Sequence, residues 1–227
     1  MNHKILVVLV LLGLMMKSGD FSYAAESKKN LKVLGVGDST TAGMPGFRSP
    51  AEAPPYGNGD ETSQYAYWIM QRHPEWQVMN RGISGQRSDE ILARLPQELK
   101  RVKPDVVIIL AGVNDVYQGR SAESVKSNLK KMYQLASKDG CKLVVCTILA
   151  YNTADKNQRK QIIHVNEWIR VQAKTHGFIF CDTFRALSSL HGPFHLTNSP
   201  DGMHPSVDDY KRMGNAITVA LEKGIAG

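Results

Sequence analysis

The sequence predicts an α/β fold in which a five-stranded parallel sheet carries helices on both faces. Short apolar runs alternate with longer amphipathic segments along the chain. This alternation is typical of parallel strands joined by crossover helices. With 227 residues, the chain is long enough for one substantial core, and the usual domain size leaves no comfortable room for a second domain.

Five of the apolar runs have the length of strands. They cover residues 31–36, 76–79, 106–110, 142–149 and 178–181. Five such strands suit a doubly wound, flavodoxin-like sheet, and helices on both of its faces make a three-layer sandwich.

Helical segments separate the strands. The expected helices cover residues 62–72, 88–101, 121–140, 155–175 and 206–223. Ser88 is expected to cap the second helix, with Asp89 and Glu90 in its first turn, where acidic side chains complement the helix dipole. Ser121 is expected to cap the third helix, and Gly140 to end it in a left-handed conformation.

The chain begins with a segment typical of a signal peptide. Lys4 precedes an apolar run over residues 5–16, which is too short to span a bilayer comfortably. Ser22-Tyr23-Ala24 places small residues at the minus-three and minus-one positions of a cleavage site. We expect residues 1–24 to be removed and residues 25–227 to form one exported domain, periplasmic or extracellular, without stable membrane insertion. An uncleaved membrane anchor is the alternative.

Cleavage after Ala24 would leave a basic protein. It removes Lys4, Lys17 and Asp20, a net charge of +1, so the formal charge falls from +7 to +6. A basic surface can favour anionic partners, but the Lys and Arg residues are scattered rather than clustered. We expect no nucleic-acid partner.

Three cysteines, Cys141, Cys146 and Cys181, make an odd set that is too small for a disulfide framework. Cys146 and Cys181 lie inside strand-like runs, where buried thiols behave as small apolar side chains. In an oxidising compartment a bridge from Cys146 to Cys181 or to Cys141 stays open, although neighbouring parallel strands rarely offer disulfide geometry.

A loop rich in proline and glycine separates the first strand from the first helix. It runs from Ala42 to Glu61 and contains Phe47 and Tyr56. At about twenty residues it exceeds an ordinary connection, so we expect a functional or mobile loop. Its two aromatic residues are candidates for contact with a ligand.

Four short motifs stand in one order along the chain. They are Gly37-Asp38-Ser39-Thr40, Asn80-Arg81-Gly82-Ile83-Ser84-Gly85, Gly112-Val113-Asn114-Asp115 and Asp201-Gly202-Met203-His204. The first three follow the first three expected strands, and ligands of open parallel sheets bind outside the carboxyl ends of the strands. We therefore expect three loops to converge at one edge of the sheet.

Side chains in these motifs suit acyl transfer through a serine. That chemistry needs a nucleophile, a base, a carboxylate that orients the base, and donors aimed at the developing oxyanion. We expect Ser39 to be the nucleophile, His204 the general base and Asp201 its orienting carboxylate. Asn114 offers a side-chain amide to the oxyanion, and Gly85 and Ser39 offer backbone N–H groups.

The order and spacing of the four motifs resemble the GDSL/SGNH hydrolase family of small serine esterases, over nearly the whole chain after the N-terminus. The resemblance implies the SGNH hydrolase fold. It also assigns the donor role in the second motif to Gly85 and leaves Gly82 to serve the backbone turn. Asp38 and Asp115, beside the motif residues, are expected to hold the loops through hydrogen bonds to backbone N–H groups.

The resemblance further implies a carboxylic ester hydrolase that forms an acyl-enzyme on Ser39 and uses no metal or organic cofactor. The polar loop at residues 42–61, an insertion relative to minimal thioesterase-like members, favours a short, acetyl-like group on a polar or carbohydrate carrier. The substrate would then be a small-molecule or polysaccharide ester, and we expect a monomer.

Three other functions fit the same residues. They are a lysophospholipase or thioesterase acting on lipid acyl groups, an acyltransferase, and an inactive carbohydrate- or lipid-binding module. His191 and His195 precede the fourth motif and would line the pocket or, as the weaker alternative, hold a metal ion.

Overall fold

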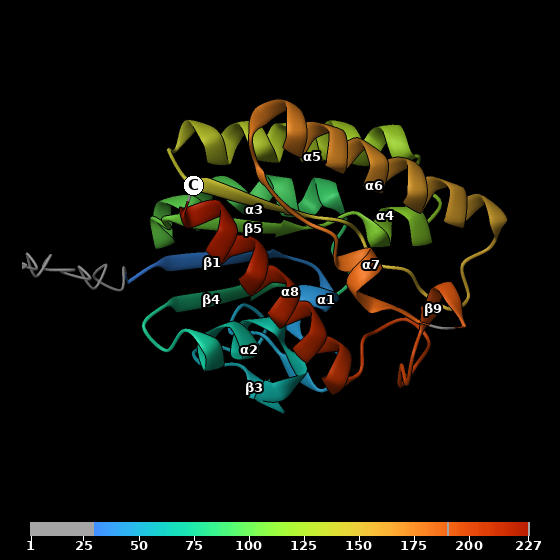
Figure 1. The fold of residues 1–227 in the computed structure, drawn as a ribbon, viewed down its shortest axis with the longest axis horizontal. Coiled ribbons are helices and arrows are strands. Elements are labelled where there is room, and N and C mark those ends of the chain that lie inside the picture. Colours follow the sequence, from blue (N-terminus) through green and yellow to red (C-terminus); the bar gives the residue numbers. More distant parts are fainter. Residues whose placement is uncertain (1–29, 190, 227) are drawn as a thin grey trace, which may run out of the picture.

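A five-stranded parallel sheet organises the molecule (Figure 1). The computed structural model describes residues 30–189 and 191–226, so the targeting segment expected at residues 1–24 lies outside the described residues. The strands are β1 (Lys32–Gly37), β4 (Gln77–Gly82), β5 (Val106–Leu110), β6 (Lys142–Cys146) and β7 (Ile179–Cys181). Their order, β4-β1-β5-β6-β7, is the flavodoxin-like order. The predicted fold class is confirmed.

Helices cover both faces of the sheet (Figure 1). One face carries α3 (Ser88–Val102), α5 (Ala122–Lys138) and α6 (Lys156–His176), and the other carries α2 (Tyr65–Arg72) and α8 (Val207–Ala226). Within the described ranges, no helix combines the length and the hydrophobicity needed to cross a bilayer.

Several short elements were not predicted from the sequence. They are the helices α1 (Ser39–Ala42), α4 (Val113–Tyr117) and α7 (Thr183–Leu187), the 3-10 helix η1 (Glu61–Ser63), and the paired strands β2 (Phe47–Arg48) with β3 (Asn58–Gly59) and β8 (Ser188–Ser189) with β9 (Gly192–Leu196). Each is too short to show a hydrophobic period.

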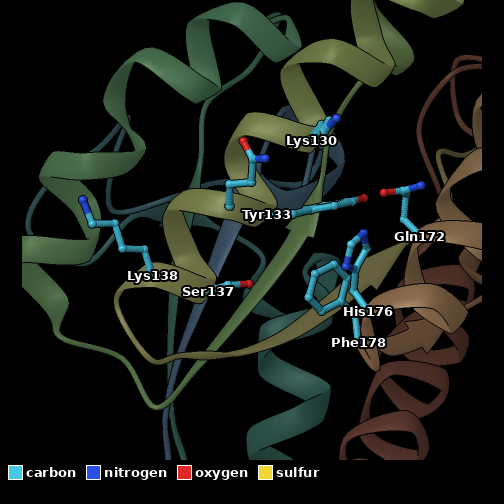
Figure 2. Close-up of a pocket in the computed structure, with 8 residues that line it drawn as sticks. Lys130, Tyr133, Ser137, Lys138, Gln172, His176 and Phe178 are labelled. Carbon is cyan, nitrogen blue, oxygen red and sulfur yellow. The ribbon is translucent and has the colours of Figure 1, made fainter.

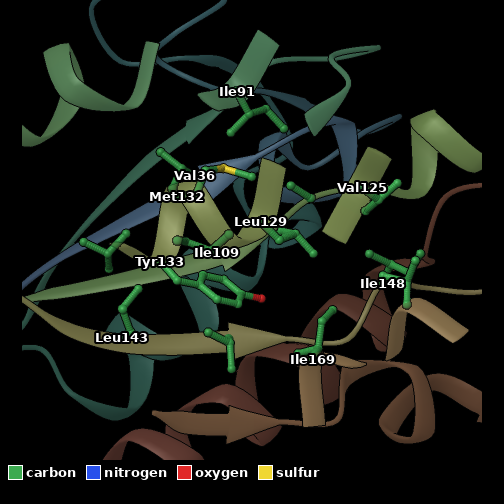
Figure 3. Packing of buried hydrophobic residues seen from close by; sticks show 14 of the residues in the cluster. Val36, Ile91, Ile109, Val125, Leu129, Met132, Tyr133, Leu143, Ile148 and Ile169 are labelled. Carbon is green, nitrogen blue, oxygen red and sulfur yellow. The ribbon is translucent and has the colours of Figure 1, made fainter. Parts of the chain in front are cut away.

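Alternate residues of β5 supply two separate cores. Val107 and Ile109 belong to the cluster under α3, α5 and α6, part of which is shown in Figure 3. Val106, Ile108 and Leu110 belong to the cluster under α2 and α8. Burial on both faces explains why this strand is a continuous apolar run rather than an alternating one.

Strand β6 ends at Cys146 rather than at residue 149 as predicted. Beyond it, the side chain of Asn166 on α6 binds both backbone groups of Ile148, accepting from its N–H at 2.8 Å and donating to its carbonyl at 2.9 Å. A side chain thus takes the place of a neighbouring strand, and the apolar run continues without sheet pairing.

The helix caps agree with the sequence in one case and differ in another. Ser121 caps α5 as predicted, accepting from the N–H of Ser124 at 3.2 Å. The prediction that Ser88 caps α3 is wrong, because Arg87 holds the cap position. Ser88 instead donates from its N–H and its hydroxyl to the two carboxylate oxygens of Asp115, each at 2.7 Å.

All three cysteines are free thiols. Cys146 and Cys181 are buried and face each other directly across β6 and β7. The neighbouring Cys181 and burial together hold the pKa of Cys146 well above its ordinary value. The pair therefore fits the prediction of apolar thiols in the core.

Candidate active site

The first motif turns the end of β1 into a short helix. Ser39 is the first residue of α1, and Asp38 is its N-cap. Asp38 Oδ1 accepts from the N–H of Thr40 at 2.9 Å and from its hydroxyl at 2.8 Å. Asp38 therefore holds this turn as predicted, although Ser39 stands in a helix rather than in a loop.

Asp38 is also electrostatically unusual. Burial raises its pKa to about 6, against the hydrogen bonds from Thr40, which lower it. Its other oxygen, Oδ2, is buried and has no hydrogen-bond partner among the described residues. Since only one oxygen is compensated, loss of hydration dominates the balance.

The fourth motif places an imidazole and a carboxylate beside Ser39. His204 Nε2 lies 3.0 Å from Ser39 Oγ, and His204 Nδ1 lies 2.6 Å from Asp201 Oδ2. The backbone N–H groups of Met203 and His204 donate to Asp201 Oδ1 at 2.9 and 2.8 Å. Ser39 and His204 are 165 residues apart in sequence, so the fold as a whole brings these groups together.

Asp201 is held in its ionised form. Partial burial works to raise its pKa, but hydrogen bonds from the His204 ring and from the backbone of His204 and Met203 outweigh burial and lower the pKa below its ordinary value. An ionised carboxylate at Nδ1 favours the tautomer with the proton on that nitrogen. Nε2 is then free to accept the hydroxyl proton of Ser39.

The turn of the second motif depends on Gly85 rather than on Gly82, which was the residue predicted for it. Gly85 takes the left-handed conformation, with φ of +77°, and its N–H has no hydrogen-bond partner within the described part of the chain. Gly82 is the last residue of β4, where an added Cβ would lie 2.1 Å from the backbone nitrogen of Ala42. Gly82 therefore serves the close packing of β4 on α1, and the turn belongs to Gly85.

The side-chain amide of Asn114 is anchored through one of its two hydrogens. It is the second residue of α4, again a helix rather than a loop, and is 7% exposed. Its Nδ2 donates to the carbonyl of Gln86 at 3.0 Å. Because a side-chain amide has two N–H bonds, this anchor leaves the second one available. Ser39, Gly85 and Asn114 thus follow three adjacent strands, β1, β4 and β5.

A partly buried arginine that the sequence analysis did not identify connects residues of the site. Arg94 on α3 donates from Nε to Gln86 Oε1 at 2.7 Å and from Nη2 to the carbonyl of Gly37 at 3.0 Å. Since the carbonyl of Gln86, the residue directly after the second motif, also anchors Asn114, Arg94 connects the first motif with the end of the second and, through Gln86, with the third. The sequence pattern of an amphipathic helix predicts that an arginine faces solvent. The one feature of the sequence that indicates burial of Arg94 is its position one turn after the core residue Ile91.

The aromatic residues of the long loop lie in a different place from the serine. Phe47 is 3% exposed and Tyr56 is 85% exposed. Together with Asn80 and Arg81 they line a hollow of about 450 Å³ beside the edge strand β4, and the lining does not include Ser39. The expectation that these side chains touch a ligand at the serine receives no support.

A second hollow, of about 520 Å³, lies between α5 and α6 (Figure 2). It is lined by Lys130, Tyr133, Gln134, Ser137, Lys138, Gln172, His176 and Phe178. It adjoins the amino ends of β6 and β7. Ser39 follows the carboxyl end of β1, so this hollow lies at the opposite ends of the strands.

The histidines before the fourth motif sit on the hairpin formed by β8 and β9. The rings of His191 and His195 are 5.4 Å apart, and both residues are exposed. Among residues 30–189 and 191–226, no group of three or more His, Cys, Asp or Glu side chains is arranged to hold a metal ion.

The chain is similar to known esterases. It is 33% identical over 128 residues to an arylesterase of Vibrio mimicus, covering 56% of this chain and 60% of that protein. It is 32% identical over 121 residues to esterase TesA of Pseudomonas aeruginosa, covering 51% and 53% of the two chains. The matches thus span little more than half the length of these relatives.

Solved structures share this fold, and a family model matches most of the chain. A lipolytic protein of the G-D-S-L family from Desulfitobacterium hafniense superposes with a TM-score of 0.70 at 22% identity, over 85% of this chain and 100% of that one. A GDSL-like lipase from Bacteroides thetaiotaomicron gives 0.67 at 22% identity, over 85% and 88%. The model of the GDSL-like lipase/acylhydrolase family matches residues 36–212. The chain belongs to the GDSL-like lipase/acylhydrolase family.

Proposed function

We propose that the protein hydrolyses carboxylic esters through an acyl-enzyme on Ser39. The observation that carries this proposal is the continuous contact from Ser39 Oγ through the His204 ring to Asp201, with distances of 3.0 and 2.6 Å. This is hydrogen-bond reach for a nucleophile, its base and the group that orients the base.

The reaction has two halves. Ser39 Oγ attacks the acyl carbon while His204 Nε2 takes the hydroxyl proton, and the same proton then passes to the departing alkoxide as the ester C–O bond breaks. Water attacks the acyl-enzyme with His204 again as base, which releases the carboxylic acid and restores Ser39. In both tetrahedral intermediates the oxyanion would accept from the N–H groups of Gly85 and Ser39 and from the free N–H of Asn114.

The decisive experiment uses Ser39→Ala. The wild type should cleave p-nitrophenyl acetate and take up one fluorophosphonate label per chain, and the variant should do neither. Retained turnover in Ser39→Ala would rule out this mechanism. A wild type that neither labels nor turns over would favour the inactive binding module.

For the substrate, we propose a short acyl group on a polar carrier such as a sugar. The support is the polar composition of the loop at residues 42–61. Relatives named thioesterase 1/protease 1/lysophospholipase L1, 34% identical over 80 residues, favour lipid acyl groups as the second candidate. A series of p-nitrophenyl esters separates the two, since a maximum at long acyl chains contradicts the proposal. Product analysis with added alcohols or sugars tests acyl transfer.

We also propose that the protein is exported as a monomer after cleavage behind Ala24. The support is the basic start, short apolar run and small residues of the first 24 positions. N-terminal sequencing of the exported protein should begin at Ala25, and light scattering should give the mass of one chain. An intact Met1 on the mature protein would contradict the export proposal.

A further inference from the structure

The long loop between α1 and α2 is fastened to the second motif at two points. Ser49 Oγ donates to the carbonyl of Gly82 at 2.6 Å, and Glu52 Oε1 accepts from the N–H of Ser84 at 2.8 Å. These partners lie 33 and 32 residues apart in sequence. The two bonds bracket Ile83, so the loop grips the start of the turn that carries Gly85.

The backbone N–H groups of this turn are almost all occupied. Ile83 donates to the carbonyl of Gly37 at 3.2 Å, and Gln86 donates to the carbonyl of Ile83 at 3.4 Å. Ser84 donates to Glu52. Within the described part of the chain, the Gly85 N–H is the one in this turn that has no acceptor. A side chain of the inserted loop thus fixes the peptide between Ile83 and Ser84, which adjoins the peptide that carries the Gly85 N–H.

The contact with Glu52 is costly to keep. Glu52 is half-buried, and its Oε2 and the neighbouring Ser84 Oγ are both buried without a hydrogen-bond partner among the described residues. A carboxylate that loses water and gains a single donor is poorly compensated. The contact is therefore better explained by the orientation that it gives to the turn than by its own contribution to stability.

We propose that Glu52 is a positioning residue that sets the direction of the Gly85 N–H by accepting the hydrogen bond of Ser84. This proposal rests on the proposed ester hydrolysis. It gives the inserted loop a part in turnover that does not require the loop to touch the substrate.

The experiment compares three substitutions at Glu52. Glu52→Ala removes the acceptor, and Glu52→Asp withdraws it by one methylene. Both should lower kcat about tenfold or more while leaving KM near the wild-type value, because a displaced oxyanion donor weakens the transition state rather than substrate binding. Glu52→Gln keeps an acceptor oxygen without the charge and should retain wild-type kcat. Glu61→Ala, an exposed glutamate of the same loop, is the matched control.

A second measurement separates positioning from general loosening. An alkylboronic acid, which forms a tetrahedral adduct on serine, should lose affinity in Glu52→Ala and Glu52→Asp in proportion to kcat. Unchanged kcat in folded Glu52→Ala overturns the proposal. A loss of kcat that Glu52→Gln shares also overturns the proposal. The same holds for a loss of activity that appears as a raised KM together with a lowered Tm. If the wild type itself neither turns over esters nor takes up the fluorophosphonate label, ester hydrolysis has failed instead.

Discussion

At the scale of single residues, the site depends on which backbone and amide hydrogens are left free. Gln86 occupies one N–H of Asn114, and Glu52, Gly37 and Ile83 accept the other amides around Gly85. The residue types of the site could be predicted from the four motifs. The occupancy of each donor could not, because it is set by contacts between distant segments.

The side chain of Asn114 should contribute strongly to turnover, although less than the general base. Asn114→Ala removes one oxyanion donor, which typically costs about 100-fold or more in kcat with little change in KM. Steady-state kinetics on a p-nitrophenyl ester measures both constants. The exposed Asn215→Ala serves as control, and a loss below about threefold in Asn114→Ala would show that the amide is not a donor.

Asp38 should make stability depend on pH. Its pKa is raised from 3.8 to about 6 in the folded chain, so between these values the folded state holds a proton that the unfolded state has lost. The contribution is complete below pH 3.8 and disappears as the pH rises through about 6. Relative to Asp38→Asn, the wild type should lose up to about 3 kcal/mol of unfolding free energy from pH 4 to pH 7.

Urea unfolding of both proteins across this range measures the difference. Asp38 titrates only in the wild type, so subtracting the two curves removes the contribution of every other group. Parallel pH profiles would show that the buried carboxyl has an ordinary pKa.

At the scale of elements, α2 and α8 pack closely at a glycine. An added Cβ at Gly214 would lie 2.6 Å from Trp68 Cβ and 2.9 Å from the carbonyl of Tyr65. Glycine inside a helix costs about 1 kcal/mol relative to alanine, so its presence was a sequence signal for a tight crossing. The partner helix could not be predicted, since no local pattern records which two helices meet.

Gly214→Ala should therefore destabilise the protein even though alanine is the better helix former. We expect a net loss of about 1 kcal/mol or more, as for other overpacked sites. The neighbouring exposed position supplies the control, since Asn215→Ala gains helix propensity without a steric clash. A raised Tm for Gly214→Ala would show that the helices separate at little cost.

At the scale of the whole molecule, the sheet divides the apolar interior into two cores. The sequence predicted this architecture well, because runs such as residues 106–110 and the helical periods are local signals. The contacts of Glu52 with Ser84 and of Arg94 with Gly37 could not be predicted. They join residues that lie 32 and 57 positions apart in the sequence, and no local pattern records such pairs. The motifs could thus be predicted from the sequence, whereas the side-chain hydrogen bonds that connect them could not.

The two cores should unfold together because they share the strands. Ile108→Val and Ile109→Val each empty part of a different core and should cost about 1 kcal/mol, with urea unfolding still a single transition. Tryptophan fluorescence and far-ultraviolet circular dichroism should report the same midpoint in each variant. The control is Ile163→Val, at a side chain that is 55% exposed. Separate midpoints for the two probes would mean that the cores unfold independently.

Asp201 and His204 stand three residues apart and are joined by ring and backbone hydrogen bonds, whereas a single contact connects His204 to Ser39. A movement of the final loop would shift this pair together and lengthen its contact with Ser39. We therefore expect heating to abolish activity at a lower temperature than the one at which the sheet unfolds. Cooling should restore the activity. Activity and circular dichroism, followed over one temperature ramp, should give two different midpoint temperatures. Coincident curves would contradict this expectation.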